Sequence, residues 1–289
     1  MKKFILIFLL SIFFVSCSTV KETGKFKITE ESGFLWKVKS STATVFLFGS
    51  IHVAREDMYP LSQKTEDAFE SSDALVVELD INKVDPALMR KKAMYQDDRT
   101  LESELSKETY RKLEALLLVH KVPKTGYYKL KPWMAMMTVL LLELNKAGFD
   151  KSLGLDNYFL EKSKNKKEIL ELENAEEQLD LLDIELGNLQ NEFIDYSLLD
   201  QSLWLQQIDT LVNLWKTGNV KEMEKYVLEP MEEHPEFEII TDKLYTQRNI
   251  RMAKKIEDYL KTNKTYFVVV GAAHLIGDEG IVELLRKSN

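Results

Sequence analysis

Two histidines near opposite ends of the chain share one local sequence pattern. His52 ends the run Val-Phe-Leu-Phe-Gly-Ser-Ile-His, and His274 ends the run Phe-Val-Val-Val-Gly-Ala-Ala-His, so each follows a glycine, Gly49 or Gly271, by three positions. A neutral imidazole can bind a metal ion or move a proton near neutral pH. A glycine at a strand end permits a sharp turn and a close approach of the backbone to a bound group. We therefore predict that the two segments form one functional site.

Two carboxylates follow strand-like runs in the same way. Glu78 ends the apolar run Ala-Leu-Val-Val, and Glu173 ends Ile-Leu-Glu-Leu. Burial of an ionised carboxylate is costly unless it is paired or coordinates a cation. A divalent metal bound by His52, Glu78 and His274 is thus the expected arrangement. The alternatives are a salt bridge or a solvated strand end for Glu78, and a water-facing position for Glu173, which lies in an acid-rich stretch.

An arginine interrupts an apolar helical stripe near residue 250. A step of four residues leads from Leu244 through Arg248 to Met252, and Asn249 lies beside the arginine. A guanidinium on a core-facing stripe needs a partner, and its forked donors suit a carboxylate of the site or an oxygen of a substrate. A purely structural ion pair is the alternative.

These residues can meet if their runs are parallel strands of one sheet. Parallel strands present their carboxyl ends along one edge, where the ligand sites of α/β proteins form. The expected elements are a β-hairpin of residues 34–39 and 44–48, a helix at 60–69, strands at 74–79, 167–172 and 265–270, and a last helix at 279–286.

The pattern predicts an α/β domain at residues 30–289, with a central mixed or largely parallel sheet and flanking helices. Helical periodicity fills a large insertion at about 86–165 and a further region at about 176–262. The most apolar helix, at 132–144, is too short to span a bilayer, which needs about 20 apolar residues. We expect it to be a buried core helix.

The N-terminus has the layout of a secretory signal peptide. Lys2 and Lys3 precede an apolar run, and residues 14–17, Phe-Val-Ser-Cys, resemble a lipobox whose cysteine becomes the first mature residue. We expect a signal peptide at 1–17, lipidation of Cys17, a polar tether at 18–29, and export to a cell envelope membrane through the lipid anchor. Cys17 is the single cysteine, so the domain has no internal disulfide and no thiolate metal cluster.

The charge balance argues against one class of partner. The chain has 47 acidic and 39 basic residues, and loss of the signal segment removes two of the lysines. An acidic protein of this kind is repelled by phosphate backbones, so nucleic acid is not an expected partner.

Beyond these arguments, the chain resembles the TraB, PrgY, GumN and Tiki family from Leu35 to Leu285. The matching pieces, in chain order, are Leu35-Trp36-Lys37-Val38, Phe48-Gly49-Ser50-Ile51-His52, Val77-Glu78-Leu79-Asp80, Lys131-Pro132-Trp133, Gly154-Leu155-Asp156, Leu172-Glu173 with Gln178, Arg248-Asn249, and Val270-Gly271-Ala272-Ala273-His274-Leu275 with Gly277 and Gly280.

The resemblance implies an α/β core with a helical insertion and, through the Tiki branch, a metal-dependent peptidase without a His-Glu-x-x-His helix. By match of motif, His52, Glu78 and His274 would be metal ligands or catalytic groups, supported by Glu173 and the Arg248-Asn249 pair. Other branches of the family regulate peptide pheromones or polysaccharide export, so membership does not by itself imply proteolysis.

Two functions compete. The first is a metal-dependent hydrolase of peptides, in which Mn²⁺, Co²⁺, Fe²⁺ or Zn²⁺ activates a water molecule, Glu173 is the general base, and Arg248 with Asn249 stabilises the oxyanion. The second is a non-catalytic lipoprotein that sequesters a peptide or a haem-like ligand in the same crevice. A haem site needs an axial ligand and an apolar slot, but it does not need a carboxylate and an arginine beside two histidines.

Overall fold

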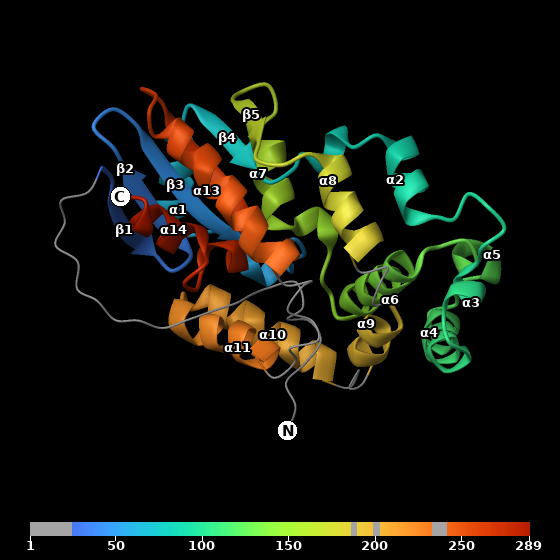
Figure 1. The fold of residues 1–289 in the computed structure, drawn as a ribbon. Helices are drawn as coiled ribbons and strands as arrows, with labels where there is room; N and C mark the ends of the chain where they lie inside the picture. The colour runs from blue at the N-terminus through green and yellow to red at the C-terminus, as the bar shows by residue number, and fades with distance from the viewer. Residues whose placement is uncertain (1–24, 186–189, 199–202, 233–241) are drawn as a thin grey trace.

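The structure, a computed structural model, describes residues 25–185, 190–198, 203–232 and 242–289 (Figure 1). The expected signal segment, Cys17 and most of the expected tether lie outside the described residues.

One six-stranded mixed sheet forms the centre of the domain. Its order is β1-β2-β3-β6-β4-β5, in which β1, β2 and β3 pair antiparallel and β3, β6, β4 and β5 pair parallel. This confirms the α/β class and the largely parallel sheet. The strands are β1 Lys27–Ser32, β2 Leu35–Lys39, β3 Thr44–Ser50, β4 Ala74–Val77, β5 Glu168–Glu171 and β6 Thr265–Gly271.

Strand β1 differs from the sequence expectation. It begins at Lys27, so the last residues of the stretch that we expected to be a tether are paired with β2 in the sheet. Its sequence, Lys-Ile-Thr-Glu-Glu-Ser, is polar and its side chains are exposed or half-buried, because it is an edge strand. Such a strand carries little of the apolar alternation on which a prediction depends.

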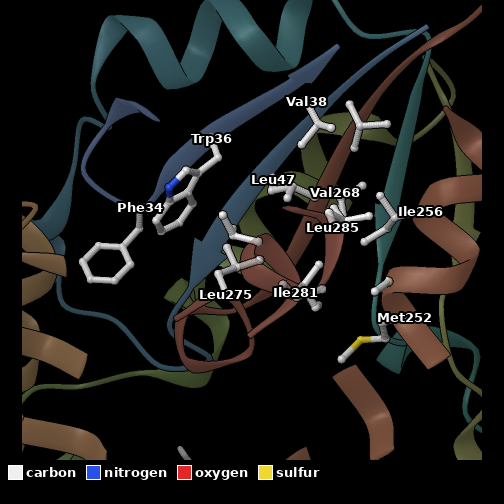
Figure 2. Close-up of a cluster of buried hydrophobic side chains, with 14 of the residues drawn as sticks. Phe34, Trp36, Val38, Leu47, Met252, Ile256, Val268, Leu275, Ile281 and Leu285 are labelled. Atoms are coloured by element: carbon white, nitrogen blue, oxygen red, sulfur yellow. The ribbon is translucent and has the colours of Figure 1, made fainter. Parts of the chain in front are cut away.

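The central strands are buried on both faces. All residues of β4, and all of β6 after Thr265, are buried, as the continuous apolar runs of a covered parallel sheet require. On one face, helix α13 (Gln247–Tyr259) and helix α14 (Ile281–Lys287) contribute Met252, Ile256 and Leu285 to a core with Val268 (Figure 2).

The other face is covered by aromatic side chains from helix α1 (Gln63–Glu70) and helix α7 (Leu155–Ser163). The ring of Phe159 lies 4.8 Å from that of Phe267 and 5.4 Å from that of Phe48, measured between centroids. Full burial of each phenylalanine stabilises the fold by about 1.5–3 kcal/mol. This packing fixes the strand that leads to the first Gly-x-x-His segment.

Helices fill the region that we expected to be a helical insertion, and their buried side chains share one cluster with Trp204, Tyr245 and Ala273. Figure 1 shows helices α3, α4 and α5 at the far end of the molecule from strands β1 and β2. The helices of this region are α2 Pro86–Ala93, α3 Leu101–Glu104, α4 Lys107–Val119, α5 Lys124–Tyr127 and α6 Pro132–Lys146.

Helix α6 matches the core helix expected at 132–144. Pro132 stands in its first turn, where the missing N–H costs nothing, and Trp133, Met136 and Val139 are buried. Within the described ranges, no helix is both long and apolar enough to cross a membrane.

Further helices follow β5, as the pattern of residues 176–262 predicted. They are α8 Ala175–Asp180, α9 Gln190–Ser197, α10 Trp204–Lys216 and α11 Val220–Glu232, and α13 follows a short π-helical turn at Asp242–Thr246.

Candidate functional site

The four parallel strands end side by side, and each is followed by a residue singled out from the sequence. Ser50 at the end of β3 pairs with Gly271 at the end of β6. Beside them, the backbone N–H of Glu173 donates to the carbonyl of Glu78 at 2.9 Å, which continues the pairing of β4 and β5 past the strand ends. The topology therefore brings His52, His274, Glu78 and Glu173 to one edge of the sheet.

Gly271 is the point on which three of these side chains converge. A Cβ atom built on Gly271 would lie 3.5 Å from Glu78 Oε1, 3.5 Å from His274 Cδ2 and 3.6 Å from His52 Nε2. The backbone N–H of Gly271 donates to Glu78 Oε1 at 2.6 Å. A glycine at this position leaves the space between the three groups open.

Arg248 joins the two carboxylates. Its Nε donates to Glu173 Oε1 at 2.9 Å, and its second terminal nitrogen donates to Glu78 Oε2 at 2.7 Å and to Glu173 Oε2 at 2.6 Å. Gln178 donates to Glu173 Oε2 at 2.8 Å. Charge-assisted, forked contacts of this kind are among the strongest hydrogen bonds in proteins. Removal of one partner would leave an uncompensated buried charge.

The network keeps Glu78 ionised although it is buried. Burial alone would raise the pKa of Glu78, but the neighbouring His274 and Arg248 outweigh it and lower that pKa to about 2. Glu78 is therefore a carboxylate at neutral pH, and Arg248 is its permanent counter-charge.

Arg248 has the charged partners that an arginine on a core-facing stripe requires, because it lies between Glu78 and Glu173. Arg248 and Gln178 donate to the oxygens of Glu173, so this carboxylate fixes the position of the guanidinium, and its expected part as a general base stays a prediction.

His274 is held in one tautomer by Asn249. The Asn249 Nδ2 donates to the carbonyl of Glu279 at 2.8 Å, so its Oδ1, which lies 2.6 Å from His274 Nδ1, is the acceptor. His274 Nδ1 therefore carries a hydrogen, and Nε2 has a free lone pair 3.8 Å from Glu78 Oε1. Burial lowers the pKa of His274 to about 4, so the imidazole is neutral at pH 7.

Asn249 thus has both ends of its amide engaged. This contact orients the His274 ring, and the expected contact of Asn249 to an oxyanion stays a prediction. The ring of Tyr245 covers the same imidazole, with 5.2 Å between the ring centroids.

His52 has a different environment. Its Nδ1 lies 2.9 Å from Asp156 Oδ2, and Ser50 Oγ donates to the other oxygen of the same carboxylate at 2.9 Å. Asp156 raises the pKa of His52 to about 9. The imidazole is 65% exposed, so solvent screens part of this effect.

Asp156 is a residue that sequence reasoning left without a role. It belongs to the segment Gly154-Leu155-Asp156, and a Cβ on Gly154 would lie 2.2 Å from the carbonyl oxygen of His52, so only glycine permits the approach. The Leu155 N–H donates to the carbonyl of Ile51 at 3.1 Å. One sequence signal could have identified Asp156. It is an acidic residue two positions after a glycine, at the start of a helix.

The side chains of the site can be compared with the ligands that a divalent metal ion requires. Both histidines form a hydrogen bond through Nδ1 to a side-chain oxygen, of Asp156 or of Asn249, as metal-binding histidines usually do through the ring nitrogen that is not a ligand. His274 Nε2 lies 3.8 Å from Glu78 Oε1, so these two groups would be close enough to serve as ligands of one ion. Among the described residues, no group of three or more His, Cys, Asp or Glu side chains is already arranged to hold a metal ion.

A separate pocket of about 310 Å³ opens beside Trp215. It is lined by residues of the β1–β2 turn, the segment before α1 and the end of α10, and none of the candidate site residues lines it. We therefore place the candidate site at the strand ends and not in this pocket.

Comparison with known proteins agrees with this architecture. The chain is 27% identical over 251 residues to the uncharacterized protein YbaP of Escherichia coli (strain K12), a match that covers 83% of this chain and 87% of that protein. The YbaP protein of Shigella flexneri gives the same values. No solved structure matches the chain. The profile of the TraB/PrgY/gumN family matches residues 34–289, the whole segment that carries both Gly-x-x-His motifs and the residues between them, and the chain therefore belongs to this family.

Proposed function

We propose that this protein is a metal-dependent hydrolase of peptides, with a divalent ion held by His52, Glu78 and His274. The observation that carries the proposal is the convergence of His52 Nε2, Glu78 Oε1 and the His274 imidazole around Gly271, all within 3.6 Å of one point. Two imidazoles and a carboxylate, without a thiolate, suit Mn²⁺, Co²⁺, Fe²⁺ or Zn²⁺.

Each residue of the site has a separate role in this proposal. Asp156 and Asn249 orient the two imidazoles through Nδ1, and Arg248 holds Glu78 as a carboxylate. The bound ion would polarise a carbonyl group and lower the pKa of its water. Asp156 raises the pKa of His52 to about 9, so the protonated imidazole must lose its Nε2 proton before Nε2 can bind an ion.

The proposal includes the substrate class and the place of action. Peptides are the substrates that the Tiki branch of the family suggests. Export, with a lipid on Cys17 as the anchor to a cell envelope membrane, would place the site where extracytoplasmic peptides are available.

The test is a calorimetric titration with Mn²⁺ and Zn²⁺ of the wild type and of His52→Ala, Glu78→Gln and His274→Ala. We expect each substitution to reduce affinity at least tenfold, and a double-histidine variant to lose less than the sum of the single losses, because the ligands act as a unit. The control is His120→Gln. That histidine pairs with Glu143 in the helical insertion and lies outside the site.

Peptide cleavage is followed in parallel, with and without the ion. A folded wild type that binds neither ion, or a double-histidine variant that binds as well as the wild type, would contradict the proposal. In that case binding of peptide or haem without cleavage becomes the function to test.

A further inference from the structure

The loop that follows strand β3 is paired with the segment that leads into helix α7. Ala54 and Asp150 exchange two backbone hydrogen bonds, of 3.1 Å and 2.8 Å, and form an isolated antiparallel bridge. The Leu155 N–H donates to the carbonyl of Ile51 at 3.1 Å, so bonds between the two segments lie on both sides of His52. We call the two paired segments the clip, residues 51–55 and 149–156.

The contact between His52 and Asp156 joins the two segments of the clip. His52 Nδ1, in one segment, lies 2.9 Å from Asp156 Oδ2, in the other. The His52 side chain is mostly exposed, so packing does little to hold it in place. The position of this imidazole therefore depends on how firmly the clip is closed.

Arg55 ties both segments of the clip to helix α10. Its guanidinium carbon lies 4.5 Å from the ring centroid of Phe149, the first residue of the opposite segment. Its Nη1 donates to Asp209 Oδ1 of α10 at 2.6 Å, and its Nε donates to Asp57 Oδ1 at 3.2 Å. A planar guanidinium can stack on an aromatic ring and bind carboxylates through its forked donors at the same time.

Helix α10 supports the loop on both sides of His52. Before the histidine, Trp215 Nε1 donates to the carbonyl of Gly49 at 2.7 Å, and after it Arg55 is bound as described. One buried cluster combines residues of the loop, of the opposite segment and of α10: Ala54, Phe149, Ile208 and Val212. The contacts of Arg55 thus add to an apolar junction of the same three parts.

We infer that Arg55 is a positioning residue of the candidate site, which keeps the clip closed and thereby keeps His52 in contact with Asp156. A single exposed ion pair would contribute little, but here the pair acts together with the stacking on Phe149 and with a second carboxylate. The inference deepens the proposed function, on which it rests for the role of His52 as a metal ligand.

The first readout does not involve a metal ion. Long-range ¹H–¹⁵N spectra of the EDTA-treated full chain at pH 7 report the state of His52 Nδ1, and Asp156→Asn gives the shift of the ring without its charged partner. In Arg55→Met we expect the His52 shift to move toward the Asp156→Asn value, because an open clip separates the two groups. A shift that stays at its wild-type position would overturn the inference.

The second readout is the calorimetric affinity for Mn²⁺ and Zn²⁺, measured on variants that are folded at the temperature of the titration. Arg55→Met should bind the ion about tenfold more weakly, at the low end of the range for groups that orient a metal ligand. Arg55→Lys, which keeps the charge but not the planar fork, should lie between this variant and the wild type. In an Asp156→Asn background, Arg55→Met should have little further effect, because both residues act through one contact. Fully additive losses would contradict a role through Asp156.

The matched control is Arg99→Met in the helical insertion. Arg99 also pairs with an aspartate two positions away, Asp97, and its guanidinium carbon lies 4.8 Å from the ring centroid of Tyr95. The same set of contacts is thus removed far from the clip in sequence, and neither readout should change. Equal effects of the two arginine variants would assign the result to the loss of any such cation, and the inference would be wrong.

The outcomes separate this inference from the proposed function. If Arg55→Met does not fold, Asp209→Asn breaks the same tie from the side of α10 and should shift the His52 signal in the same direction. A wild type that binds no ion would end the metal proposal, and the spectra of His52 would still decide the role of Arg55. A wild type that binds the ion, together with an unmoved His52 signal in both variants, would end this inference alone.

Discussion

The two Gly-x-x-His segments repeat one sequence pattern in two different environments. His274 is buried, bonded to the neutral amide of Asn249, and has its pKa lowered to about 4. His52 is mostly exposed, bonded to the carboxylate of Asp156, and has its pKa raised to about 9. The motif thus places an imidazole at a strand end, and the Nδ1 partner and the burial decide whether that imidazole is neutral or charged at pH 7.

The two glycines of the pattern also differ. A Cβ on Gly49 would lie 2.9 Å from the Cα of Ala272, against backbone, whereas a Cβ on Gly271 would meet only side-chain atoms of the site at 3.5 Å or more. Gly49 is therefore required by the packing of β3 against the second segment. Gly271 is required by the open space between the functional groups.

The largest expected effect is on stability in acid. The pKa of His274 is lower in the folded protein than its ordinary value of 6.5, so the unfolded chain binds the proton more readily. The stability that His274 contributes is present above pH 6.5 and is lost as the pH falls toward 4, on the order of 3 kcal/mol in all. Urea unfolding between pH 6.5 and 4.5 measures it, above the range in which Glu78 contributes.

For His52 the sign is reversed. Its pKa is raised in the folded protein, so its contribution is present below pH 6.5 and is lost as the pH rises through about 9. Exposure makes this effect the smaller of the two. His274→Gln should abolish the loss of stability between pH 6.5 and 4.5, and His52→Gln should abolish the loss of stability at alkaline pH. If the loss of stability in acid persists in His274→Gln, the two histidines do not differ as described.

The second prediction compares the glycines. Gly49→Ala should destabilise the protein by about 1–3 kcal/mol, because the added methyl group clashes with the Ala272 backbone. Gly271→Ala should unfold at nearly the wild-type urea concentration and yet lose metal binding, because its methyl group fills the space in front of Glu78 and both histidines. Equal losses of stability in the two variants would show that both glycines serve packing alone.

The third prediction concerns the Nδ1 partner of His52. Asp156→Asn keeps the shape but removes the charge, so the pKa of His52 should fall toward 6.5, as NMR titration of the ring protons would show. Loss of this support should weaken metal binding about 10- to 100-fold. Asp67→Asn, at an exposed carboxylate of α1, is the control. An unchanged His52 pKa in Asp156→Asn would remove Asp156 from the site.

The sequence alone determined the class of fold and the residues that meet. Four apolar runs, each followed by His or Glu, were enough to predict parallel strands and a shared edge, because the carboxyl ends of parallel strands lie on one side of a sheet. The break in the apolar stripe at Arg248 was enough to predict a charged partner. These patterns involve residues that are close together in the chain, so they can be recognised in a single sequence.

The tertiary structure decided the electrostatics. Asp156 is 104 residues from His52 along the chain, and Glu78 lies 170 residues from Arg248, so no local pattern shows which partner each group has. Those partners set the charge of each imidazole, engage Glu173 with Arg248, and turn Asn249 toward His274. The edge strand β1 was likewise identified only by its pairing with β2, because its polar residues give no apolar alternation. A pKa depends on burial and on charges within a few ångströms, and chain separation along the sequence carries no information about either.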